Sequence, residues 1–381
     1  MPPASAAPTA PMSPTNEPAA SSSTATPPSS PPSSSPPAAP FYKVVEIPRL
    51  AATGSVTVNG ISDQGVAVGQ QETAAAPRAW IYQQSAGALD ELSLDPSENG
   101  AFANGITNSG VIAGAEIPSN GPPVPGFWTV TGGAMLLTGQ YQSFAQAVAA
   151  NGSGTIIGNY GQPGTISSLP LVWTAPGYAQ TTLPGLRCDQ CTRIDITASA
   201  VNDSGLVVGS SNYSLNAGSN NVTSGMHAVQ WQAGNITDIG GLQGADYSAA
   251  YSVNTGGDVV GASRTDPSAG APTHAFLYQQ GVMTDLGTLT GDSSSSANSI
   301  NDTGQIVGRS QSDTATRAFL YQNGHMYDLN SLIDPASPLA GLVSLQEAVS
   351  ISANGWIAVN GTDSRDPGWK RAFLLIPPVG A

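Results

Sequence analysis

The chain has 381 residues, of which 44 are Gly and 31 are Pro, and only 9% are charged; this richness in turn residues excludes a helix bundle and leaves room for one large domain or two ordinary ones. Its 25 acidic residues outnumber its 11 Lys and Arg, and the formal net charge of −14 excludes nucleic acid as a partner, because phosphate would be repelled. No segment approaches the roughly 18 consecutive apolar residues that a membrane-spanning segment needs.

Residues 1–40 differ from the rest of the chain in composition. They contain 13 Pro, 10 Ser, 9 Ala, 4 Thr and a single charge, Glu17. So little apolar surface cannot offset the entropy lost on ordering, and we expect a disordered tether. Basic residues followed by an apolar run would mark an export signal, and neither is present. Two explanations of this start stay open: a leader has been removed or the first Met is misplaced, or the segment is a plain disordered tail.

From Phe41 onward, a nine-residue pattern recurs seven times. It reads apolar, Asn/Ser/Thr, two variable residues, Gly, one variable residue, two apolar residues and Gly. The copies are Ile61–Gly69, Ile106–Gly114, Ala150–Gly158, Val201–Gly209, Val253–Gly261, Ile300–Gly308 and a degenerate Ile351–Val359. Their first glycines lie 44 to 52 residues apart, a period typical of a four-stranded propeller blade.

Each repeat divides into four strands, named a to d from the inside outward. In the sixth repeat we expect them at Ala297–Asn301, Gln305–Ser310, Arg317–Tyr321 and Met326–Leu329, with Gly-containing turns between a and b and between c and d. The third strand recurs in all seven repeats. The sequence therefore predicts an all-β fold, a seven-bladed β-propeller with four antiparallel strands per blade.

The two ends of the chain complete one blade between them. The chain stops soon after strand c of the last repeat, so residues 377–381 form only a tail and that blade lacks strand d. Val44–Pro48 matches the fourth strand Met283–Gly287 and has no strand c before it. We therefore expect the N-terminal segment to close the last blade of a propeller that spans residues 41–376, which leaves no open sheet edge.

These repeats resemble the bacterial extracellular HAF-repeat family over most of residues 41–376. The match is strongest at His274–Tyr278, Asp285–Leu289 and Ile300–Ser310, and His274–Phe276 spells the tripeptide that names the family; the second and third repeats have lost it. The resemblance implies export and a repeat scaffold, with no catalytic residues to transfer. An extracellular or periplasmic location is the resulting expectation.

Cations at the start of strand c match carboxylates at the end of strand d. The pairs are His227/Asp238, His274/Asp285, Arg317/Asp328, Arg78/Glu91 and Arg371/Glu46. Antiparallel strands bring such positions together as cross-strand charge pairs. Because Arg replaces His and cannot ligate a metal as His does, we interpret the pairs as structural. His325, in a hairpin turn, is expected in solvent.

Two further motifs contain residue types that also occur in metal sites. Turns such as Asp203-Ser204-Gly205 lack the spaced carboxylates and terminal Glu of a calcium loop, and Asn or Asp closes such turns on its own backbone. Cys188 and Cys191 lack the further ligands of a zinc site and the βαβ context of a redox motif. We expect a disulfide in an oxidising compartment and free thiols otherwise. No metal and no cofactor are predicted.

The connections between strands b and c and between strands d and a share one face, the loop face, and vary in length. The opposite face, the turn face, carries only tight turns. Nine residues of the d–a connections are candidate ligand-binding residues near the channel mouth: Asp95, Glu98, Tyr141, Asp189, Arg193, Asp246, Tyr247, Asp292 and Glu347. Carboxylates with aromatic groups suit carbohydrate or cation binding, whereas the plain alternative is a ring of solvated acidic loops.

The function predicted is that of an exported, non-catalytic binding or scaffolding module that uses the loop face. Its partner would be a cell-envelope protein or glycan, and we expect a monomer. The alternative is a secreted propeller hydrolase or lyase that acts on polysaccharide. An enzyme would need two convergent carboxylates, at least one of them with a perturbed pKa, and a scaffold would not.

Overall fold

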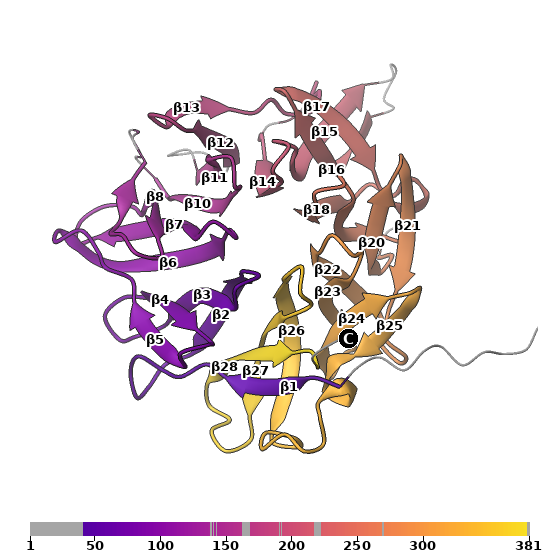
Figure 1. Ribbon diagram of the computed structural model, residues 1–381. Helices are drawn as coiled ribbons and strands as arrows, with labels where there is room; N and C mark the ends of the chain where they lie inside the picture. Colours follow the sequence, from indigo (N-terminus) through magenta and orange to yellow (C-terminus); the bar gives the residue numbers. More distant parts are fainter. Residues whose placement is uncertain are drawn as a thin grey trace, which may run out of the picture. The chain divides into compact units, whose positions relative to one another are not determined.

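The computed structural model describes residues 41–378 except 138, 140, 142, 162–167, 190, 192, 217–221 and 269. The predicted tether, residues 1–40, and residues 379–381 of the predicted tail lie outside this part. Within it, 28 strands form seven antiparallel four-stranded sheets, arranged as blades around a ring (Figure 1). The predicted all-β, seven-bladed propeller is confirmed.

The four strands of a blade follow one another outward from the centre. The innermost strands a are β2 (Val56–Ile61), β6 (Glu98–Ile106), β10 (Ala145–Ala150), β14 (Ile196–Val201), β18 (Ser248–Val253), β22 (Ser294–Ile300) and β26 (Val343–Ile351). Strands b are β3 (Val66–Gln71), β7 (Val111–Pro118), β11 (Thr155–Gly161), β15 (Val207–Asn216), β19 (Val259–Arg264), β23 (Ile306–Gln311) and β27 (Ile357–Asp363).

The outer half of each blade is made in the same way. Strands c are β4 (Arg78–Gln83), β8 (Val124–Thr129), β12 (Ser168–Thr174), β16 (Val222–Gln232), β20 (Thr273–Gln279), β24 (Thr316–Gln322) and β28 (Lys370–Ile376). Strands d are β5 (Ala88–Glu91), β9 (Met135–Leu136), β13 (Ala179–Thr182), β17 (Asn235–Gly240), β21 (Val282–Gly287), β25 (His325–Asp328) and β1 (Lys43–Glu46). The two short 3₁₀ helices among the described residues are η1 (Leu242–Gly244) and η2 (Leu329–Leu332).

The hydrophobic core lies between neighbouring blades. One aromatic residue of every strand c is fully buried there: Trp80, Trp128, Trp173, Trp231, Phe276, Phe319 and Phe373. Trp128 of blade 2, for example, packs with Val68 and Ile81 of blade 1. Each blade thus depends on its neighbour for the burial of its apolar face, and a closed ring leaves no face uncovered.

Both glycines of the repeated pattern have a structural reason. The first lies in the turn between strands a and b with positive φ, 77° at Gly304, which L side chains rarely adopt. The second packs where no side chain fits: a Cβ on Gly308 would lie 1.9 Å from the carbonyl oxygen of Ser296. The pattern therefore marks a turn followed by a close approach of two backbones.

The N-terminal strand closes the seventh blade, as predicted. β1 pairs antiparallel with β28, so that Val44 lies opposite Leu375. Beside it, the backbone N–H of Tyr42 donates to the carbonyl of Leu332 at 2.7 Å. Burial of the Tyr42 phenol raises its pKa to about 12. The closing segment is therefore held by blade 7 and by the connection that leads into that blade.

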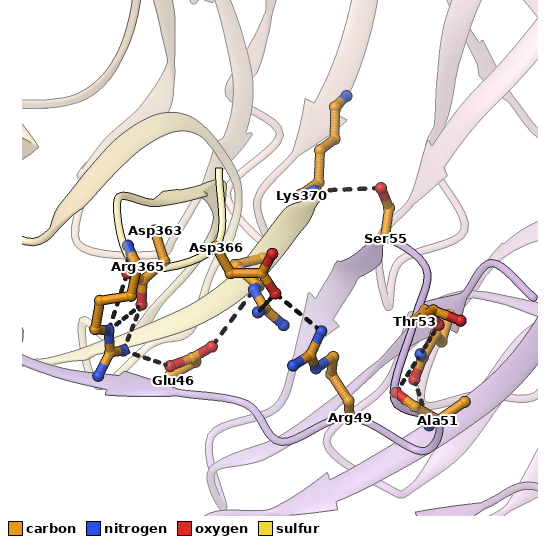
Figure 2. Close-up of polar contacts among 11 residues, drawn as sticks. Glu46, Arg49, Ala51, Thr53, Ser55, Asp363, Arg365, Asp366 and Lys370 are labelled. Carbon is orange, nitrogen blue, oxygen red and sulfur yellow. Dashed lines mark hydrogen bonds and ion pairs between the residues drawn. The ribbon is translucent and has the colours of Figure 1, made fainter. Parts of the chain in front are cut away.

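An ion-pair network accompanies this closure (Figure 2). Arg371 lies 3.7 Å from Glu46, which confirms the predicted pair between the two chain ends. Asp366 joins two cations, with 2.6 Å to Arg371 and 3.2 Å to Arg49. Arg365 adds a second contact to Glu46 at 3.1 Å. Because Arg371 is only 5% exposed, these carboxylates neutralise a largely buried guanidinium.

The other four predicted charge pairs are also present. The ring Nδ1 atoms of His227 and His274 lie 2.9 Å from Asp238 and Asp285, respectively. The remaining pairs join Arg317 to Asp328 at 3.2 Å and Arg78 to Glu91. The pairs are diagonal across the sheet, since Asp328 is directly opposite Phe319 in the register. A structural role explains all five, because each cation already has a carboxylate partner.

Candidate functional site

The sulfur atoms of Cys188 and Cys191 form a disulfide in the connection that enters blade 4. The described residues contain no group of three or more His, Cys, Asp or Glu side chains that could hold a metal ion. No helix in this part of the chain is long and apolar enough to cross a membrane.

Asparagines connect the blades to one another at two levels. Near the turn face, an Asn opens the a–b turn in blades 3 to 6, closes that turn and reaches the next blade. Asn301 Oδ1, for example, accepts from the N–H of Gln305, and its Nδ2 donates to the carbonyl of Ser352. The predicted turn chemistry is confirmed for this Asn. The neighbouring Asp differs, because Asp302 accepts from the N–H of Thr255 in the preceding blade.

A second level of asparagines lies nearer the loop face. Strand a of each blade contains a β-bulge. In blades 1, 2 and 6 the unpaired residue of the bulge is an Asn whose Nδ2 donates to a backbone carbonyl of the next blade. In blades 3 and 7 an Asn of strand b does the same. These five side chains are Asn59, Asn104, Asn298, Asn159 and Asn360.

Two junctions lack this asparagine: that between blades 4 and 5, where Ser199 and Ser210 occupy the two positions, and that between blades 5 and 6. Tyr251 occupies the bulge position of β18 and Ala262 the corresponding position of β19. Beside Tyr251 and Ala262, between blades 5 and 6, there is a cavity of about 380 Å³. β18 and β22, the inner strands of these blades, lie side by side in the ring (Figure 1).

This cavity, the blade 5–6 pocket, is lined by polar and aromatic side chains. Its lining residues are Tyr247, Tyr251, Ala262, Arg264, Thr273, Ser294, Ser295, Ser296, Arg309 and Gln311. Two guanidinium groups are among them and no carboxylate is. Its volume is within the range of about 300–1,000 Å³ that is typical of small-molecule sites.

The pocket's charged and aromatic groups are held in place from outside. Asp246 binds Arg264 at 2.8 Å, and Glu347 binds Arg309 at 3.3 Å. The Arg264 guanidinium lies 6.0 Å from the centre of the Tyr247 ring. Burial, together with the neighbouring Tyr247, raises the pKa of Tyr251. Both carboxylates thus position the arginines without lining the pocket.

Of the nine candidate residues, the structure brings three to this pocket. Tyr247 lines it, and Asp246 and Glu347 hold its arginines. Asp292 belongs to the next connection, and its side chain is only 2% exposed because it binds Arg317 at 2.9 Å. Sequence reasoning missed Tyr251, Arg264 and Arg309, although each differs from its counterparts in the other repeats.

Two candidates lie at the connection between blades 1 and 2. Asp95 accepts hydrogen bonds from the backbone and the hydroxyl of Ser97, which lower the pKa of that carboxyl. Its own N–H donates to Oε1 of Glu116, a fully buried residue. Burial raises the pKa of Glu116 to about 7, and the charges of Glu98 and Asp95 act in the same direction. None of these carboxylates lines the blade 5–6 pocket.

The remaining three candidates have local partners. Tyr141 donates to Gln180 at 3.0 Å and lies edge-on to Tyr160 in blade 3. Asp189 binds Arg187, and Arg193 binds Asp195, both at 2.8 Å. These three residues therefore contribute to the structure of their own connections.

The end of the central channel on the turn face is built differently. The a–b turns of all seven blades surround a cavity of about 300 Å³, and none of the nine candidates lines it. Backbone N–H groups and turn side chains bind each other around this ring, as in the hydrogen bond from Ala353 to Asp63 that joins blade 7 to blade 1. These polar groups are therefore engaged in the ring itself.

No protein-family model and no curated protein matches the sequence. Solved structures match in fold. The β-propeller domain of the trilobed protease from Pyrococcus furiosus, described as having an open velcro topology, superposes with a TM-score of 0.57 at 8% identity, over 84% of this chain and 95% of that one. Here the ring is closed by β1, which is a difference from that description.

Two longer proteins also match. Pyrococcus horikoshii acylaminoacyl peptidase gives a TM-score of 0.51 at 9% identity, over 81% of this chain and 49% of the peptidase. The extracellular domain of a putative hybrid two-component system from B. thetaiotaomicron gives 0.52 at 11% identity, over 90% of this chain and 40% of that one. This chain thus spans half or less of their length, and the similarity concerns the propeller fold.

Proposed function

We propose that the protein is an exported, non-catalytic binding or scaffolding module that takes a glycan or other cell-envelope component at its loop face, in the blade 5–6 pocket. The observation that carries the proposal is that the blade 5–6 pocket is lined by Tyr251, Arg264 and Arg309, three residues that no other blade has at the corresponding positions. Tyr251, Arg264 and Arg309 are dispensable to the repeat fold, because the remaining blades fold with other residues there. Polar and aromatic groups that line a pocket and that a fold does not need are available for recognition.

An extracellular or periplasmic location belongs to the same proposal. It rests on the resemblance to the HAF-repeat family and is supported by the Cys188–Cys191 disulfide, since disulfides persist mainly in oxidising compartments. A monomer is consistent with a ring whose last blade is closed by the chain's own N-terminal strand. The hydrolase or lyase alternative has less support: Glu116 has the perturbed pKa that an acid catalyst needs, but its side chain is fully buried.

A binding screen against cell-envelope glycans and envelope proteins tests this proposal. We expect the double variant Asp246→Ala/Tyr247→Ala to bind the ligand found in the screen at least tenfold more weakly, with a melting temperature within a few degrees of the parent. The matched control is His325→Ala, an exposed side chain on the turn face, which should bind normally. Full binding by the double variant, together with loss of binding by the control, would contradict the proposal. A turnover activity that the double variant loses would favour the enzyme alternative.

A further inference from the structure

The charges that line the blade 5–6 pocket are opposite in sign to the charge of the whole chain. The protein has 25 acidic and 11 basic side chains, yet two of those 11 line one cavity with no carboxylate among the lining residues. Each guanidinium is balanced by one carboxylate outside the lining, Asp246 at 2.8 Å from Arg264 and Glu347 at 3.3 Å from Arg309. The pocket therefore presents cationic donors and no carboxylate to a ligand, which suits an anionic group.

Both guanidiniums keep hydrogen-bond donors for a ligand. An arginine has five N–H donors in a planar fork. The ion pair of Arg264 engages Nη1 at 2.8 Å from Asp246, and that of Arg309 engages Nη1 at 3.3 Å from Glu347. Each carboxylate fixes its arginine on one side. A planar carboxylate of a ligand matches the geometry of the N–H groups that remain.

The rest of the lining matches a sugar ring. The two tyrosines, Tyr247 and Tyr251, offer flat apolar faces and phenol groups, and Ser294, Ser296 and Thr273 offer hydroxyls. Neutral hydroxyls that both donate and accept suit the hydroxyls of a saccharide. A cavity of about 380 Å³ is at the small end of ligand sites, which favours one or two rings.

From this arrangement we infer that the blade 5–6 pocket recognises a uronic-acid residue, with the sugar carboxylate bound by Arg264 and Arg309 and the ring held against Tyr247 and Tyr251. This inference rests on the proposed function, of which it specifies the ligand class. It makes the two arginines specificity-determining residues, because a neutral sugar of the same shape would leave their remaining donors unmatched.

The test measures binding of the full chain to disaccharides of galacturonate, guluronate and glucuronate by calorimetry, each beside its methyl ester. The ester keeps the shape of the sugar and removes the negative charge. We expect at least one uronate to bind tenfold or more tightly than its ester. Arg264→Gln combined with Arg309→Gln should remove that preference, whereas Arg78→Gln, a partly exposed arginine of blade 1, should keep it.

The outcomes separate the inference from the proposed function. Equal binding of acid and ester, no binding of any uronate, or stronger binding of a sulfated disaccharide would each overturn the uronate inference. If neutral glycans bind and Tyr251→Ala abolishes that binding, the proposed binding function stands without the carboxylate. If no envelope component binds in a manner that depends on Tyr247 or Tyr251, the proposed function itself fails. Melting curves of each variant show whether the fold is retained.

Discussion

At the scale of single residues, Glu116 is a buried acid in a position that the other blades fill with neutral groups. The corresponding Gln71 in blade 1 accepts from the backbone N–H of Leu50, and Ser310 in blade 6 accepts from that of Leu289. Glu116 performs the same task with Oε1, which accepts from Asp95, but its Oε2 is buried without a hydrogen-bond partner. In blade 2 a carboxylate accepts the backbone hydrogen bond that an amide accepts in blade 1 and a hydroxyl in blade 6, and burial of its charge costs desolvation energy.

This position predicts a pH-dependent stability. The folded protein raises the pKa of Glu116 from 4.5 to about 7, so the native state binds the proton more tightly than the unfolded state. The contribution is fully present below about pH 4.5 and is lost as the pH rises through 7. The shift corresponds to about 3 kcal/mol at most. Glu116→Gln, which copies Gln71, should lessen the decline in urea-unfolding free energy between pH 5 and pH 8.

The control for this prediction is an exposed acid on the outer strand of blade 1. Asp90→Asn should leave the pH profile of the parent unchanged, because Asp90 is exposed at the end of β5. If Glu116→Gln and the parent lose the same free energy between pH 5 and pH 8, Glu116 is not the titrating group.

Single residues also show how far sequence reasoning reached. The eleven-residue spacing predicted the pairs of His227, His274 and Arg317, because both members belong to one hairpin. It did not predict that Arg264 binds Asp246 or that Arg309 binds Glu347. Those partners come from different connections or blades. Their contact depends on how blades pack, which no local spacing encodes.

At the scale of elements, the a–b turn is both a turn and a junction. Asn202 Oδ1 accepts from the N–H of Leu206 within the turn, while Nδ2 donates to the carbonyl of Asn254 in blade 5 at 3.0 Å. The turn role was predictable from the Asn-x-x-Gly pattern. The junction role and the β-bulge of strand a were not, because both involve a partner strand or a neighbouring blade that the repeat pattern leaves unspecified.

This dual role predicts a large effect for a small substitution. Asn202→Ala removes a turn acceptor and an interblade donor, and leaves the buried carbonyl of Asn254 without this partner. We expect a loss of about 1–3 kcal/mol in unfolding free energy. Asn235→Ala, an exposed Asn at the start of β17, should change it by less than about 0.5 kcal/mol. Equal effects of the two substitutions in chemical unfolding would contradict the junction role.

At the scale of the whole molecule, the repeat count predicted more than any single motif did. Seven copies of one pattern and a missing last strand determined the blade number and the closing role of the N-terminal segment, because a ring of repeats must close on itself. The pocket was not predictable in this way. It is lined by Tyr251, Arg264 and Arg309, which depart from the repeat, and the consequence of a departure depends on the space that its neighbours leave.

The closure gives a prediction about the entire ring. β1 supplies the outer strand of blade 7, and Tyr42 is 1% exposed against the connection from blade 6, so deletion of residues 41–49 should expose β28 as an open edge. We expect a melting temperature at least 10 °C lower and concentration-dependent association in sedimentation. Deletion of residues 1–40 should change neither quantity.

A synthetic peptide of residues 41–50 added in excess should restore the monomer of the protein that lacks residues 41–49, because the peptide can pair with β28. The same peptide with Val45→Pro should not restore it, because Pro breaks the hydrogen-bond ladder between the strands. A deletion protein that melts like the parent and stays monomeric would show that the ring is stable without this closing strand.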